Sequence, residues 1–250
     1  MADIHGGYKA MMQCWERSGF DREKDELIVL GDVVDGWPDT KEVVNELLKV
    51  KNLVYILGNH DLWALDWAKD DDRNYMWISQ GGWNTLLSYN FIMPKKHIEF
   101  FENANLWMHD EETNTLFVHG GIDLSNPVES NKTDTLLWDR NLLAYAKKIH
   151  TREALRATDT GKEFIRPKIT QYDEIFIGHT SSSFYGKLEP LHYCNLWLLD
   201  TGGGWEGKLT IMDIKTKEYW QSDNVDKIYK GHEGRREISR YTEEVMEWLG

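Results

Sequence analysis

The sequence predicts an α/β protein in which short, buried, parallel strands end in polar loops rich in glycine. Two apolar runs, residues 27–30 and 53–57, are rich in Val, Ile and Leu and have the length of fully buried strands. Between them, residues 40–50 place Val43, Val44 and Leu47 on one face of a helix. A strand, a helix and a second strand form a crossover unit, so the two strands are expected to be parallel neighbours.

Polar residues follow these strands at the same edge of the predicted sheet. Asp32 follows the first strand and Asn59 follows the second, so both side chains are expected at the carboxyl edge, where open α/β sheets bind ligands. An apolar segment, or its remnant, followed by Asp or His beside glycine occurs three more times, in residues 2–7, 116–121 and 175–180. Glycine permits the sharp turns and the close backbone approach that a crowded site needs.

The polar residues of these segments form a set of candidate metal ligands. They are Asp3, His5, Asp32, Asn59, His119 and His179. A set of carboxylate, carboxamide and imidazole groups that contains no Cys suits Mn, Fe or Zn, and it suits a pair of ions better than a single ion.

Length and composition exclude several classes of protein. The chain has 250 residues and a formal net charge of −13, so it offers no basic field for a nucleic acid or an anionic membrane. Its two Cys residues, Cys14 and Cys194, do not suggest a disulfide framework. No apolar stretch has the length of a membrane span, and there is no signal peptide. We therefore expect a cytoplasmic monomer with one domain over residues 1–250.

Five motifs, in this order, resemble the signature of the calcineurin-like metallophosphoesterase superfamily. They are ADIHG at residues 2–6, GDVVD at 31–35, GNHD at 58–61, VHGG at 118–121 and GHT at 178–180. Within that superfamily the chain is similar to Ser/Thr protein phosphatases of the bacteriophage lambda type. The similarity lies in GFD at residues 19–21, GGW at 81–83, LWDR at 137–140 and LDTG at 199–202. It runs from Asp3 to about Ile214, nearly the whole chain.

The resemblance implies a four-layer αββα metallophosphoesterase sandwich of two mixed sheets, with a small helical cap inserted at about residues 62–110. Helices are expected at residues 7–17, 62–69, 74–89 with a turn at Gly81-Gly82, after Pro94, at 136–145 and at 237–249. The second sheet is expected from strands at residues 174–177, 191–193, 196–199 and 209–214, the last one turning into a hairpin at 215–217.

The resemblance also implies a binuclear metal site. Asp3, His5 and Asp32 would bind one divalent ion. Asp32 would bridge to a second ion, which takes its other ligands from the sequence set named above: Asn59, His119 and His179. The expected metal is Mn²⁺, with Fe, Zn, Ni and Mg as alternatives. A bridging hydroxide would then hydrolyse a phosphate monoester, such as that of a phosphoprotein, a phosphopeptide or a small phosphomonoester.

Three further residues receive roles from the resemblance. His60 would protonate the leaving alkoxide, Asp35 would orient His60, and Arg140 would clamp the phosphate. Arg140, Asn59 and His60 would thus also contact the substrate. Two of these residues also have an ordinary interpretation: Asp35 as a turn residue and Arg140 as a solvated side chain on a helix. The motifs around them favour the functional reading.

Two features depart from the family pattern. In the family a buried strand leads into the first Asp, whereas only Met1 and Ala2 precede Asp3 here, which questions how rigidly Asp3 is held. The family also has an arginine that holds substrate phosphate at the position of Gly36. The sequence therefore leaves Arg140 as the main cationic clamp.

The main prediction is a protein Ser/Thr phosphatase, with phosphotyrosine also open as a substrate. One alternative on the same core is a symmetrical diadenosine-tetraphosphate hydrolase, which also often carries GNHD but needs a nucleoside pocket. A second is a broad-specificity small-molecule or phosphodiester hydrolase, against which the LWDR and DTG segments argue. A third is a non-enzymatic metal-binding relic, which the complete ligand set disfavours. Metal-dependent assays with different phosphoesters would separate these alternatives.

Overall fold

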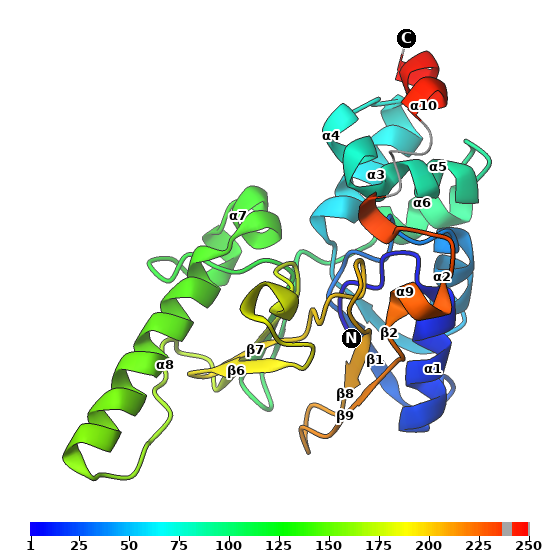
Figure 1. Ribbon diagram of the computed structural model, residues 1–250. Helices are drawn as coiled ribbons and strands as arrows, with labels where there is room; N and C mark the ends of the chain where they lie inside the picture. Colours follow the sequence, from blue (N-terminus) through cyan, green and yellow to red (C-terminus); the bar gives the residue numbers. More distant parts are fainter. Residues whose placement is uncertain (237–241, 250) are drawn as a thin grey trace.

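The computed structural model describes residues 1–236 and 242–249, and its strands lie between two groups of helices (Figure 1). A long helix, α8 (Asn141–Thr160), covers the outer face of the larger sheet through β6 and β7. On the other side of the molecule, α1 (Tyr8–Ser18) contacts α2 (Thr40–Leu47) and one of two smaller pairs of strands, the pair within residues 210–221. The layers follow the order helix, sheet, sheet, helix, which is the predicted αββα arrangement.

The larger sheet is mixed, as predicted, and has the order β3-β4-β5-β7-β6. Its central strands β4, β5 and β7 are parallel, and β3 and β6 are antiparallel edge strands. The bounds are β3 Trp107–Asp110, β4 Thr115–Val118, β5 Glu174–Ile177, β6 Leu191–Tyr193 and β7 Leu196–Leu198.

The opposing layer consists of two short strand pairs. The strands β1 (Glu26–Val29) and β2 (Asn52–Tyr55) are parallel and are joined through α2, which confirms the predicted crossover. The strands β8 (Thr210–Met212) and β9 (Tyr219–Gln221) form an antiparallel hairpin. The sequence placed β8 in one sheet with β5, β6 and β7. That placement is wrong, because β8 pairs only with β9 among the described residues.

The first three residues lie along β1 and extend this layer. The Met1 amine donates to Ile28 O at 2.8 Å, Leu30 N donates to Met1 O at 2.9 Å, and Asp3 N donates to Gly31 O at 3.1 Å. Met1, Ala2 and Asp3 are all buried. The short segment before the first candidate ligand is therefore held by backbone hydrogen bonds on the edge of β1.

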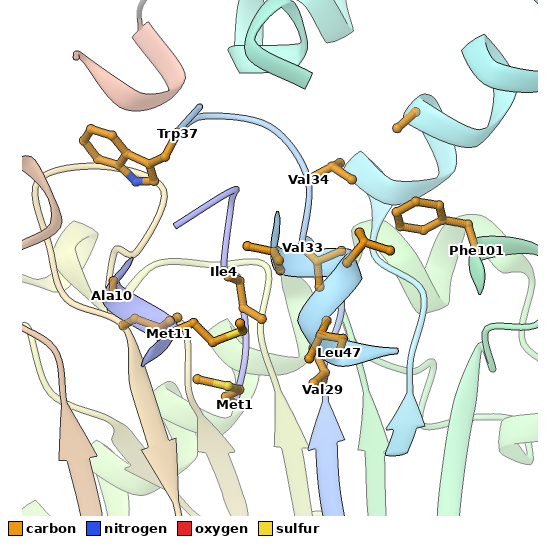
Figure 2. Close-up of a cluster of buried hydrophobic side chains, with 14 of the residues drawn as sticks. Met1, Ile4, Ala10, Met11, Val29, Val33, Val34, Trp37, Leu47 and Phe101 are labelled. Carbon is orange, nitrogen blue, oxygen red and sulfur yellow. The ribbon is translucent and has the colours of Figure 1, made fainter. Parts of the chain in front are cut away.

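Three hydrophobic clusters correspond to the three spaces between the layers. Leu116, Ile175 and Leu196 belong to the cluster under α8. Phe117 and Phe176 stack at 5.3 Å in the cluster between the two sheets. The third cluster, drawn in Figure 2, lies beneath α1 and α2 and contains the labelled residues Met1, Ile4, Met11, Val29 and Leu47.

Short helices between β2 and β3 gather at one end of the molecule (Figure 1). They are α3 (Asn59–Asp70), α4 (Tyr75–Trp77), the π-helical turn η1 (Ile78–Gly82), α5 (Trp83–Ser88) and α6 (Lys95–Glu102). The predicted helices of this region and the turn at Gly81-Gly82 are therefore confirmed. The last described helix, α10 (Thr242–Leu249), lies beside them, and the rest of the predicted 237–249 helix is outside the described residues.

The helix predicted at residues 136–145 is wrong, because the chain breaks there. One helix, α7 (Thr133–Trp138), ends before Asp139, and α8 begins at Asn141. The carboxylate of Asp139 accepts from Leu142 N at 2.8 Å and so satisfies a free amide of the first turn of α8. Asp139 is therefore the residue that separates the two helices.

The remaining elements are short helical segments: η2 (Val128–Ser130), η3 (Ser182–Tyr185) and α9 (Val225–Ile228). Among the described residues, no helix combines the length and the apolar character that a bilayer crossing requires.

Candidate metal centre

The loops that follow the strands carry a strained backbone at the predicted ligands. Five non-glycine residues of the site have a left-handed φ: Asp3 (54°), His5 (49°), Asp32 (51°), Asp35 (69°) and His179 (66°). Each such residue costs of order 1–3 kcal/mol, and strain of this kind gathers at functional sites. The backbone thus marks the same positions that the motifs indicated.

Two glycines allow the loops to meet at these residues. A Cβ on Gly58 would lie 2.1 Å from Asp32 Oδ1, and a Cβ on Gly178 would lie 2.3 Å from Asp3 Oδ2. No side chain fits at either position. These glycines therefore form part of the wall around the two carboxylates.

Six predicted ligands meet in two overlapping groups. Asp3, His5 and Asp32 can bring one ligand atom each within 4.8 Å of one another. Asp32 forms a second such group with His119 and His179. Asn59 joins the second group, because its Oδ1 lies 2.8 Å from His179 Nδ1 and 3.0 Å from His119 Nε2. All six side chains are buried, and Asp32 is common to both groups.

Backbone carbonyls fix the imidazoles of the site. His5 Nδ1 lies 3.0 Å from Val34 O, and His119 Nδ1 lies 2.6 Å from Leu30 O. A carbonyl only accepts, so Nδ1 carries the hydrogen in both rings and Nε2 presents its lone pair to the site. This second contact of a histidine is the arrangement that orients metal-bound imidazoles in proteins.

In the group formed by Asp32, Asn59, His119 and His179, acceptor atoms face one another without a hydrogen between them. His119 Nε2 lies 3.0 Å from Asn59 Oδ1 and 3.4 Å from Asp32 Oδ2, and both oxygens are acceptors. His179 Nε2 is buried and has no hydrogen-bond partner among the described residues. Such groups are unfavourable in a protein interior unless a proton or a cation joins them. The donor set therefore fits a divalent ion.

The charge of the site leads to the same conclusion. Burial, and then the neighbouring Asp200 and Asp32, raise the pKa of Asp3 well above its usual value. Burial also raises the pKa of Asp200 to about 6. For Asp32, burial acts upward, but His119 and His60 lower its pKa well below the usual value. Three buried acidic groups in one site need cationic compensation, which divalent ions would provide.

His60 and Asp35 form a buried pair beside these ligands. His60 Nδ1 lies 2.5 Å from Asp35 Oδ2. The same carboxylate accepts from Trp77 Nε1 at 2.8 Å and from Thr85 Oγ1 at 2.7 Å. Burial and the charge of Arg235 lower the pKa of His60 well below its usual value. Asp35 is thus fixed from two helices of the 59–102 region and holds one edge of the imidazole.

Asp61 is a residue of the site whose role the sequence did not assign. Its carboxylate accepts from Asp32 N at 2.7 Å, Val33 N at 2.9 Å and Gly58 N at 2.8 Å. One side chain therefore ties the loop after β1 to the loop after β2. Asp61 is the last residue of the GNHD motif, which indicated its position, but only the folded structure shows which backbone N–H groups it accepts from.

Arg140 lies at the exposed side of the site. It follows the helix break at Asp139, and its side chain is exposed. Burial, together with the charges of His119 and Arg140, lowers the pKa of His179 to about 2. The positive charge of Arg140 therefore contributes to the electrostatic potential of the site, although Arg140 forms no hydrogen bond with the candidate metal ligands.

Arg235 is a second basic residue of the site, and no feature of the sequence indicated it. Its Nη2 lies 2.8 Å from His60 Nε2, across 175 positions of sequence. The predicted resemblance ended at about Ile214, so the segment that carries Arg235 had no assigned role. Only the folded chain brings it to the metal centre.

Comparisons with known proteins agree with this geometry. A family model described as calcineurin-like phosphoesterase matches residues 1–236. Serine/threonine-protein phosphatase 1 of Salmonella typhimurium is 24% identical over 86% of this chain and 90% of its own length. A symmetrical bis(5'-nucleosyl)-tetraphosphatase of Buchnera aphidicola is also 24% identical, over 88% of this chain and 95% of its own. The solved metallophosphoesterase of Sphaerobacter thermophilus has a TM-score of 0.54 at 14% identity and covers 100% of this chain and 96% of that one.

Proposed function

Because the chain belongs to the calcineurin-like phosphoesterase family, we propose that it is a metal-dependent phosphomonoesterase of the protein Ser/Thr phosphatase type. The observation that carries this proposal is the buried His60–Asp35 pair beside two ligand groups that share Asp32. The resemblance to the lambda branch of protein phosphatases in residues 137–140 and the similarity to a Ser/Thr phosphatase also support it.

Asp3, His5 and Asp32 would hold one divalent ion, and Asp32, Asn59, His119 and His179 would hold another, with Mn²⁺ as the expected metal. Two such ions supply an activated water and neutralise negative charge on a phosphoryl group. The burial of the carboxylates and the fixed Nδ1–H groups of His5 and His119 prepare the residues for this role.

The chain itself provides the proton for the leaving group. Asp35 holds His60 by Nδ1, so His60 Nε2 is the atom directed toward the substrate. When His60 is protonated, its Nε2–H would give its proton to the alkoxide oxygen of the leaving group as the P–O bond breaks. Arg140, at the exposed side of the site, would attract the phosphate and orient it.

A dinucleoside polyphosphate is a second candidate substrate, and one observation favours it. Trp63 and Trp138 are partly exposed and lie against each other with ring centroids 4.9 Å apart. Trp63 lies 5.1 Å from the His60 ring, and Trp138 lies 5.8 Å from the His179 ring. Indole faces beside a phosphate site provide surfaces on which a nucleobase stacks. The similarity to symmetrical bis(5'-nucleosyl)-tetraphosphatases supports this candidate to about the same extent.

A comparison of substrates tests the proposal. The Mn²⁺-loaded protein is assayed with a phosphoserine peptide, a phosphotyrosine peptide, p-nitrophenyl phosphate and diadenosine tetraphosphate. We expect a higher kcat/KM for the phosphopeptides than for the dinucleotide. A preference for the dinucleotide that Trp138→Ala selectively removes would favour the second candidate. Absence of metal-dependent hydrolysis of all four would refute the enzymatic proposal.

A further inference from the structure

Arg235, in the segment after α9, extends its side chain to the metal centre. Arg235 N donates to Gly204 O at 3.2 Å, which holds the backbone against the loop before β8. The guanidinium lies 4.7 Å from the centroid of the Trp205 ring. Arg235 is thus held by its main chain and by stacking of its side chain.

Glycines on both sides leave room for this side chain. A Cβ on Gly204 would lie 2.9 Å from Arg235 Cδ, and one on Gly36 would lie 3.2 Å from Arg235 Cγ. A Cβ on Gly81 would lie 3.2 Å from Arg235 Cα. Three glycines from separate parts of the chain therefore form the passage through which Arg235 reaches His60.

The guanidinium has neutral partners only. Arg235 Nε donates to Gln80 O at 3.3 Å, and Nη2 donates to Gln80 Oε1 at 2.7 Å and to His60 Nε2 at 2.8 Å. Its Nη1 forms no hydrogen bond with the described part of the chain. Within the same residues, no carboxylate lies within ion-pair distance of Arg235, although Asp32, Asp35 and Asp200 are near enough to raise its pKa against the effect of burial.

The neighbouring arginine, Arg236, has the ordinary environment that Arg235 lacks. Arg236 is exposed and pairs with the carboxylate of Glu206. A partly buried arginine without an acidic partner is costly, because it loses hydration and gains no opposite charge. A guanidinium with a free donor edge matches the oxygens of a phosphate, which it binds with two parallel hydrogen bonds.

We propose that Arg235 binds the phosphoryl group of the substrate at the metal centre. When phosphate arrives, the free Nη1 and the Nη2 that now contacts His60 bind phosphoryl oxygens, and His60 Nε2 becomes accessible to the leaving group. This inference rests on the proposed function for the identity of the phosphate as part of a substrate. The site thus has two phosphate-binding arginines, Arg140 on its exposed side and Arg235 from the opposite end of the chain.

Three variants test the assignment: Arg235→Ala, Arg235→Lys and the matched control Arg236→Ala, which removes the same charge one residue away. Inorganic phosphate is titrated into each Mn²⁺-loaded protein by calorimetry, and kcat/KM is measured with p-nitrophenyl phosphate. Arg235→Ala should weaken phosphate binding and lower kcat/KM by roughly ten- to a hundredfold, while Arg236→Ala changes neither by more than about twofold. Arg235→Lys should recover part of the loss, because it keeps the charge without the planar fork.

Metal content by elemental analysis and thermal unfolding accompany each measurement, so that a folding or loading defect is recognised. Equal phosphate affinity in Arg235→Ala and Arg236→Ala would overturn the proposal. So would faster turnover in Arg235→Ala, which would make Arg235 a plug over His60. If the wild-type protein binds phosphate through Arg235 but hydrolyses none of the esters, the proposed function fails and this assignment stands.

Discussion

At the scale of single residues, the contacts of His60 predict how its replacement affects different substrates. Nitrophenolate leaves without a proton, whereas a serine alkoxide needs one. General acid catalysis contributes about 10²–10⁴-fold where the proton is needed. His60→Asn should therefore lower kcat far more for a phosphoserine peptide than for p-nitrophenyl phosphate, with phosphotyrosine between them, at saturating Mn²⁺.

Asp35→Asn is the companion variant. Asp35 accepts from His60, Trp77 and Thr85, so the amide retains the packing but weakens its hold on the imidazole. The order of the three substrates should be the same, with smaller losses. Equal losses for all leaving groups in both variants, together with weaker metal binding, would assign His60 a structural role instead.

At the scale of elements, one carboxylate on α3 joins the loops after β1 and β2. Asp61 accepts from three buried backbone N–H groups, and an asparagine in its place leaves at least one of them unsatisfied. Asp61→Asn should lower the free energy of unfolding by about 1–3 kcal/mol and weaken metal binding. Denaturant unfolding and calorimetric metal titration measure the two effects.

The matched control is Asp70→Asn, at the exposed C-terminal end of the same helix. It removes an equal charge far from the loops, so stability and metal affinity should change little. If both variants were equally stable and bound metal equally well, the hydrogen bonds of Asp61 would not be what fixes the Asp32 loop.

At the scale of the whole molecule, metal removal should weaken the fold as well as activity. Without ions, the buried acidic groups Asp3, Asp32 and Asp200 have only protons, the histidines and the single guanidinium of Arg235 to offset their charge. We expect chelated protein to be inactive, and Mn²⁺ to restore activity and raise Tm with increasing concentration. Asp32→Asn should abolish both responses, because Asp32 is common to both ligand groups.

Acid should destabilise the protein through histidines remote from the metal centre. Burial lowers the pKa of His97, which contacts Tyr89 and Asn45, to about 4, and likewise lowers that of His192, which stacks on Trp197, to about 4. Below a pH of about 6.5, these two histidines bind protons in the unfolded chain but remain neutral in the folded chain until the pH approaches 4. The free energy of unfolding should therefore fall as the pH drops from 6.5 toward 4, by up to about 1.4 kcal/mol per pH unit for each histidine.

His97→Gln isolates this effect, because glutamine keeps a hydrogen-bonding group but does not titrate. Urea unfolding of the chelated protein at several pH values should give a shallower slope for this variant than for the wild type. His109→Gln, at a partly exposed position of β3, serves as the control. The same slope in all three proteins would contradict the assignment.

Local patterns in the sequence predicted what depends on neighbours along the chain. The apolar runs predicted β1, β2 and β5, and the glycine-flanked polar residues predicted the six candidate ligands, while the role of His60 came from the family resemblance. The break at Asp139 was missed, because the apolar spacing continues through it while one carboxylate caps the next helix. Arg235 was missed for a different reason. Its partners Gln80, His60 and Gly204 are brought to it only by the complete fold.

The space at Gly36 has a consequence for how related sequences vary. A Cβ at this position would lie 3.2 Å from Arg235 Cγ, and the backbone there has a φ of +83°. The two positions compete for one volume, although they lie near opposite ends of the chain. Homologous chains with a large basic side chain at the position of Gly36 should therefore lack an arginine at that of Arg235, and the two positions should change together. Such sites would always contain one cationic side chain in this volume, but the residue that provides it would come from the position of Gly36 in some sequences and from that of Arg235 in others.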